Sequence, residues 1–291
     1  MRTPASALLL LVAACATPPA SPEQPATAAA KPATELAPFP YTAAQIRDAN
    51  PPGSAYLFLL TNPDGTQDME LTRFVSNTDD VSTMHYRRWR VGASVGELVK
   101  ADAPWEDLKR HASFPAAQTT VTEARVRTPL GEIPAMQYAV ARDGKTTTFT
   151  FHQQTSGAPW HMETTAADGS THVDRVLVGR KDGETGLTWR IEVQPKELVE
   201  LNYRLGADAR LEGAFSGDGA LSWDVHSHPA GEVVTHQHGD GQQGTFAFTP
   251  PAAGAYSVMW RNPGDAPVSI LLQVSLQGEG ALESTHPAWW H

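Results

Sequence analysis

The sequence predicts a mainly β protein, in which an N-terminal antiparallel curved sheet with one or two short helices is followed by a C-terminal β-sandwich. Two observations support this fold class. Helix signals stop at about Leu187, whereas short strand-like segments separated by turn residues continue at even spacing. Asp-Gly pairs, which favour hairpin turns, recur beside runs of β-branched and aromatic residues, at Asp64, Asp143, Asp168, Asp182 and Asp218.

The first 15 residues have the form of an export signal. Arg2 precedes an apolar run from Ala7 to Ala14 that is too short to span a bilayer as a helix, and Cys15 follows. The segment Val12-Ala13-Ala14-Cys15 resembles the lipobox of bacterial lipoproteins. This resemblance implies that a peptidase removes residues 1–14 as a signal peptide and that Cys15 then carries acyl chains such as palmitate. The alternative is an ordinary secretory signal with a chance cysteine.

Residues 15–40 are expected to form a lipidated cysteine followed by a Pro/Ala-rich tether. Seven of the 23 prolines lie between Ala16 and Pro40, among small residues that cannot bury enough surface to fold. Ala16 stands after the cysteine in place of an aspartate, which in similar Gram-negative lipoproteins favours the outer membrane, here facing the periplasm. The net charge of −10 argues against nucleic acid as a partner and against electrostatic adhesion to anionic lipid. We therefore expect a cell-envelope protein that reaches the membrane through its lipid anchor.

Residues 41–183 are expected to form an antiparallel β domain with a helix. Thr42 and Gln45 fit a capping box at the start of one short helix, and a second opens at Asp102-Ala103-Pro104-Trp105. Strands are expected at Ala55–Leu60, Gln67–Val75, Val81–Val91, Thr119–Arg127, Ala135–Ala141, Thr146–Gln153, Trp160–Thr165 and His172–Val178. Over roughly 55–180, this arrangement resembles the half-barrel domains of envelope lipoproteins that carry lipid or lipoprotein.

Residues 187–291 are expected to form the β-sandwich, with the boundary near Lys181–Gly186, where charge and glycine interrupt the strand pattern. Strands are expected at Leu187–Val193, Leu198–Leu205, Arg210–Ser216, Leu221–His226, Val233–His238, Gly244–Phe248, Gly254–Arg261 and Val268–Gly278. A Pro-x-x-Gly turn precedes an aromatic strand that ends in Trp-x-Asn, matched by Pro251, Gly254, Trp260 and Asn262. This part resembles bacterial relatives of the Golgi-dynamics (GOLD) sandwich, and the resemblance implies a binding or adaptor module.

Two His-x-His pairs lie close together in this second part. If their flanks are strands, His226 and His228 project from one face, and His236 and His238 do the same on the returning strand. Two such pairs could supply three or four nitrogens to Zn(II), Cu(II) or Ni(II). Asp224, on the same strand face as His226, could act as a further ligand or orient a ligating imidazole. The sequence therefore suggests, as one hypothesis, a transition-metal site.

Three alternatives involve no metal. His236 and His238 could lie in a water-exposed glycine-rich loop, the two pairs could lie at opposite ends of their hairpin, or His226 could donate to a backbone carbonyl as a structural residue. The C-terminal segment His286–His291 adds two histidines and two tryptophans, and such tryptophans usually pack against the body or a partner.

Two other motifs resemble functional sites. Gly92-Ala93-Ser94-Val95-Gly96 matches the G-x-S-x-G nucleophile elbow, which requires a buried parallel strand that feeds a helix, whereas the surrounding pattern predicts antiparallel hairpins. The basic and aromatic run His85–Arg90 divides between two faces of a strand, so we expect a solvated strand face there.

Three functions are compatible with these patterns. The first is a non-catalytic envelope lipoprotein that binds an envelope protein, a glycan or another envelope component. The second is the same scaffold acting as a Zn, Cu or Ni binder through the His-x-His pairs. The third is a metal-dependent enzyme, for which Glu232 or Asp240 would have to serve as general base.

The Cys15→Ser variant should be released from the membrane fraction, because the sequence contains no other segment that predicts membrane attachment. Fractionation of cells that express the wild type and the variant measures this directly. Firm, detergent-dependent retention of Cys15→Ser would contradict the predicted anchor.

Overall fold

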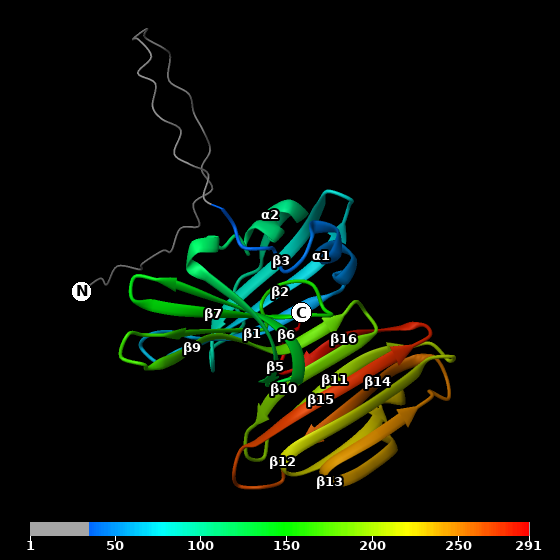
Figure 1. The fold of residues 1–291 in the computed structure, drawn as a ribbon. Coiled ribbons are helices and arrows are strands. Elements are labelled where there is room, and N and C mark those ends of the chain that lie inside the picture. The colour runs from blue at the N-terminus through cyan, green and yellow to red at the C-terminus, as the bar shows by residue number, and fades with distance from the viewer. Residues whose placement is uncertain (1–34, 291) are drawn as a thin grey trace, which may run out of the picture. The chain divides into compact units, whose positions relative to one another are not determined.

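The computed structural model describes residues 35–290 of the 291-residue chain (Figure 1), and these residues belong to one compact unit. The expected signal peptide, Cys15 and most of the tether, as well as His291, lie outside the described residues. The predicted fold class is confirmed, because the chain is mainly β, with a large antiparallel sheet system and only short helices. No helix among the described residues is long and apolar enough to cross a membrane.

The elements follow the expected order, with several corrections. The helices are α1 (Ala43–Ala49), α2 (Trp105–Arg110) and the 3₁₀ turns η1 (Ala116–Gln118) and η2 (Pro229–Gly231). The strands are β1 (Ala55–Thr61), β2 (Gln67–Asn77), β3 (Val81–Arg90), β4 (Val99–Pro104), β5 (Thr119–Thr128), β6 (Gly131–Arg142), β7 (Lys145–His152), β8 (His161–Thr165), β9 (Thr171–Asp182), β10 (Gly186–Val193), β11 (Leu198–Leu205), β12 (Arg210–Ser227), β13 (Val234–Phe248), β14 (Gly254–Arg261), β15 (Val268–Gln277) and β16 (Gly280–His286). Strands β4 and β16 are not among the expected ones, and β4 is short and mostly exposed, so no alternation of buried and exposed residues marks it in the sequence.

The N-terminal part is an antiparallel sheet in the order β5-β6-β7-β8-β9-β1-β2-β3-β4. Met84 on β3 and Tyr138 on β6 lie six positions apart in this order, yet both belong to one hydrophobic core together with residues of α1 and α2. A flat sheet would hold such strands nearly 30 Å apart at ~4.8 Å per strand. The sheet therefore curves around the helices, as Figure 1 shows.

Strand β1 is buried on both of its faces. Tyr56 and Phe58 pack into the core beneath the helices, whereas Ala55 and Leu57 pack into the core that the N-terminal sheet shares with the sandwich. A strand buried on both faces needs apolar side chains at consecutive positions, which explains the uninterrupted run AYLFLL.

The C-terminal part is a β-sandwich whose two layers share the long hairpin β12–β13. The first half of β12 pairs with β15, and its second half pairs with β14, so the strand passes from one layer to the other. The expected hairpin at Asp218-Gly219 is wrong, because this pair lies within β12, where the register shifts between Ser216 and Leu221. The Asp218 carboxylate accepts a hydrogen bond from the Ser269 amide at 2.8 Å across this bend.

The expected boundary near Lys181–Gly186 coincides with the tight turn between β9 and β10. These strands pair with each other, and β10 also pairs with β15, so hydrogen-bonded strands continue from the N-terminal sheet into the sandwich. One hydrophobic core contains residues from both sides of the turn. The division into domains 41–183 and 187–291 stays a prediction.

The C-terminal tryptophans pack against the body of the protein. Trp290 is 1% exposed and forms an edge-to-face pair with Trp189 at 5.8 Å between ring centroids. Trp289 lies between Trp189 and Trp89, at 5.6 and 6.4 Å. Gly179 on β9 makes room for this tail, since a Cβ there would lie 2.5 Å from the Trp290 ring.

The Trp290→Ala variant should lower the free energy of unfolding by about 3–5 kcal/mol, because it leaves a cavity in the shared core. Chemical denaturation followed by circular dichroism measures the loss. The exposed neighbour His286 supplies the control, and His286→Ala should change stability by less than about 0.5 kcal/mol. A similarly small effect of Trp290→Ala would show that the tail does not stabilise the fold.

Candidate functional site

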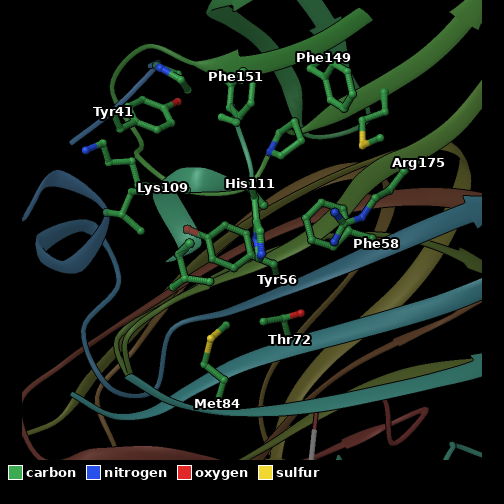
Figure 2. Close-up of a pocket in the computed structure, with 18 of the residues that line it drawn as sticks. Tyr41, Tyr56, Phe58, Thr72, Met84, Lys109, His111, Phe149, Phe151 and Arg175 are labelled. Carbon is green, nitrogen blue, oxygen red and sulfur yellow. The ribbon is translucent and has the colours of Figure 1, made fainter. Parts of the chain in front are cut away.

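A pocket of about 350 Å³ lies between the curved sheet and the helices α1 and α2 (Figure 2). Its wall is mostly aromatic and aliphatic. The strands contribute Tyr56, Phe58, Thr72, Phe74, Met84, Phe149, Phe151, Met162 and Arg175. The cover consists of Pro40, Tyr41, Ile46, Leu108, Lys109, His111, Ala112, Phe114 and the loop Gly157–Pro159.

The two-residue periodicity of a strand determines which aromatic side chains face the pocket. Successive strand residues point to opposite faces, so Tyr56 and Phe58 on β1 project to the same side, as do Phe149 and Phe151 on β7. Strands β1 and β7 are separated by β8 and β9 in the sheet order, and the curvature of the sheet turns their aromatic faces toward one pocket.

Hydrogen bonds fix the cover over the sheet. The Tyr56 hydroxyl donates to Asn50 Oδ1 at 2.6 Å, and the Asn50 amide donates to the carbonyls of Ile46 and Ser156. One buried asparagine therefore joins α1, the loop after β7 and the pocket floor. On the other side, the Tyr41 hydroxyl donates to the backbone carbonyl of His152. Burial raises the pKa of the Tyr56 hydroxyl, which keeps it protonated as a donor.

Arg175 is the charged side chain that the strands contribute to the wall. Its guanidinium lies over the Phe58 ring, with Cζ 3.6 Å from the ring centroid, and Nη2 donates to Glu70 Oε1 at 2.6 Å. Its Nε is buried and has no hydrogen-bond partner in the described part of the chain. Burial lowers the pKa of the guanidinium, and the Glu70 carboxylate opposes this shift.

The remaining polar lining lies in the cover and the floor. Lys109 Nζ is 3.1 Å from Glu106 and 5.0 Å above the Phe39 ring, and His111 is exposed at the end of α2. Thr72 lies on β2 and is 9% exposed. Among residues 35–290, no aspartate or glutamate lines the pocket.

The predicted histidine cluster lies elsewhere, on the sandwich. His226 is 6% exposed, and its two ring nitrogens face carboxylates: Nδ1 is 2.5 Å from Asp224 Oδ1 and Nε2 is 3.5 Å from Glu200 Oε1. The His228 ring is adjacent, with its centroid 5.0 Å from that of His226. The structure therefore brings this first pair together with Asp224, as their spacing in the sequence predicted.

A bulge separates the two histidines of the second pair. The register of β12 with β13 shifts beside His226, so that His226 faces Thr235 and Asp224 faces His238, which leaves His236 as an extra, bulged residue. His236 Nε2 lies 2.9 Å from the Ser227 hydroxyl, and its ring packs against Phe248 at 5.2 Å. The bulge interrupts the alternation of side chains between the two faces of the strand, so the expectation that His236 and His238 share a face does not hold.

Residues 35–290 contain no group of three or more His, Cys, Asp or Glu side chains that could hold a metal ion. The metal site at His226, His228, His236 and His238 stays a prediction without support from this arrangement. Glu232 and Asp240, the two candidate general bases of a metal-dependent enzyme, lie at different places. Glu232 is exposed after η2, and Asp240 lies opposite Ser222 in the β12–β13 hairpin.

The two other motifs have structural explanations. The segment from Gly92 to Gly96 is an irregular connection between the antiparallel strands β3 and β4, so it lacks the strand-to-helix geometry of a nucleophile elbow. Arg88 and Arg90 on β3 both form ion pairs with Asp68, at 2.9 and 2.6 Å.

Sequence reasoning did not find the pocket, whose lining residues come from segments far apart in the chain. The signal that could have indicated it is the alternation of aromatic residues in Tyr56-x-Phe58 and Phe149-x-Phe151. Either pattern alone is also typical of an ordinary core-facing strand.

No family model matches the chain, and no curated protein matches it. Among solved structures, a match described as "CBM4 structure and function" covers 56% of this chain and 81% of its own, with 11% sequence identity and a TM-score of 0.18. A likeness at this TM-score carries no argument about function. The function of the site must therefore be inferred from its own geometry.

Proposed function

We propose that this protein is a non-catalytic, lipid-anchored binding protein of the bacterial cell envelope, and that its ligand is a small, largely apolar molecule held in the pocket beneath α1 and α2. The observation that carries this proposal is the pocket itself, with its aromatic and aliphatic wall and its few polar groups. Ligand sites are typically concave, mostly apolar and about 300–1,000 Å³ in volume, with a few polar groups that orient the ligand.

The construction of the pocket supports a binding role. Tyr56 and Tyr41 direct their hydroxyls to Asn50 and to the His152 carbonyl, so their rings are held in place while their polar atoms are satisfied by the protein. A wall that is fixed before binding loses little conformational freedom when a ligand enters, which favours affinity.

The location in the envelope rests on the lipobox-like segment that ends at Cys15. Acyl chains on Cys15 would attach the protein to the membrane, and the tether of roughly 25 residues, at ~3 Å per residue in an extended form, would allow the folded part to stand several tens of Å away. A lipid-anchored protein of this kind would meet its apolar ligand at the membrane surface.

The sandwich would serve a second role, separate from the pocket. Its resemblance to GOLD domains, carried by Pro251, Gly254, Trp260 and Asn262, favours an adaptor that contacts an envelope protein or a glycan. Asn262 itself has a structural role. Its amide donates to the carbonyls of Val193 and Ala266 and thereby fixes the turn after β14.

The Ala158→Trp variant should weaken binding of a neutral fluorescent probe, N-phenyl-1-naphthylamine, by about tenfold or more. Ala158 lines the pocket, and an indole there would fill part of the space that the probe needs. The wild type should bind the probe saturably, with the emission shift of an apolar environment, and a fluorescence titration measures both affinities.

Ala117→Trp is the matched control, because Ala117 is exposed on η1 and does not line the pocket. It should bind the probe as the wild type does, and both variants should retain the β-sheet circular dichroism. Absence of saturable binding by the wild type, or equal binding by both variants, would refute the proposed site.

A further inference from the structure

Two cationic side chains, Arg175 and Lys109, line the pocket. Both have N–H donors and no acceptor atoms, whereas the hydroxyls of Tyr41 and Tyr56 already donate to acceptors of the protein. No carboxylate of the described chain lines the pocket, although the whole protein carries a net charge of −10. A ligand that pairs with either cation must supply acceptors.

We propose that the ligand carries one anionic acceptor group, a carboxylate or a phosphate, on its apolar body, and that Arg175 binds this group. This inference rests on the proposed function of the pocket and adds the chemical class of the ligand.

Arg175 is better placed for this role than the other cation. Its guanidinium lies over Phe58, a ring that itself lines the pocket, and is also held by Glu70, so its orientation is fixed before a ligand arrives. Lys109 lies in the cover on α2, next to Glu106, and Figure 2 shows it on the other side of the pocket from Arg175.

Glu70 accepts only one of the hydrogen bonds that the Arg175 guanidinium can donate. The guanidinium has five N–H donors, and the described part of the chain provides one hydrogen bond to it, from Nη2 to Glu70. The buried Nε is without a partner, which is costly for a charged group in an apolar wall. A second anion beside the guanidinium would form charge-assisted hydrogen bonds with its remaining Nη donors, in addition to the one that Glu70 accepts.

The test compares three molecules with the same ten-carbon chain: decanoate, decyl phosphate and methyl decanoate. Competition with the neutral probe on the wild-type protein gives their relative affinities. We expect at least one of the two anions to bind about tenfold or more tightly than the neutral ester, since hydrogen bonds to charged groups are stronger than those between neutral groups. The better anion then identifies the head group as a carboxylate or a phosphate.

Arg175→Gln should remove this preference and leave the affinity for methyl decanoate nearly unchanged. The double variant Glu70→Gln/Arg175→Gln should behave in the same way, and it leaves no unpaired carboxylate that could disturb folding. The matched control is Arg125→Gln, because Arg125 pairs with Glu132 at 3.1 Å on the same sheet but does not line the pocket.

Equal affinity of the ester and both anions for the wild type would overturn the inference while leaving the proposed pocket in place. Loss of the preference in Lys109→Gln but not in the Arg175 variants would overturn the assignment to Arg175. If none of the three molecules displaces a bound probe, the inference fails, and only failure of the probe itself to bind counts against the pocket.

Discussion

The burial of strand β1 on both faces is the constraint on which the rest of the structure depends. Its even-numbered side chains, Tyr56 and Phe58, form the floor of the pocket, and its odd-numbered side chains, Ala55 and Leu57, belong to the core shared with the sandwich. A one-residue shift of this strand would exchange the two sets and place the tyrosine hydroxyl in the shared core. Because β2 and β9 pair with β1 on either side, its register also sets theirs.

The pocket follows from this strand together with one polar residue. Asn50 is fully buried, and its hydrogen bonds to Tyr56, Ile46 and Ser156 connect the floor, the helix α1 and the loop that closes one side. Apolar packing alone would favour collapse of the helices onto the sheet, since voids in a core are unfavourable. The directional bonds of Asn50 define how the cover sits over the aromatic wall, and the space left between them is the candidate binding site.

The sequence predicted local features well and long-range ones poorly. The capping box of Thr42 and Gln45 is present, because a helix start depends on residues within one turn. The hairpin signal failed at Asp218, where β12 continues from one layer of the sandwich to the other, and strand parity failed at His236, where a bulge inserts one residue. The bulge at His236 lies within the β12–β13 hairpin, whereas the failure at Asp218 depends on pairing with β15, which is distant in sequence. The pocket was missed for the same reason, since each aromatic pair is an ordinary strand pattern until the curved sheet brings them together.

The central claim, that the apolar ligand binds between α1, α2 and the sheet, is tested most directly by the methionine methyl groups. Met84 and Met162 line the pocket, whereas Met69 lies in the shared core and Met259 lies on β14 of the sandwich. We suggest NMR titration of methyl-labelled Cys15→Ser protein, in which residue 15 cannot carry a competing acyl chain, with N-phenyl-1-naphthylamine. The account predicts that the Met84 and Met162 signals shift saturably while those of Met69 and Met259 stay in place. Shifts confined to Met259, or saturable binding that leaves Met84 and Met162 unchanged, would contradict it.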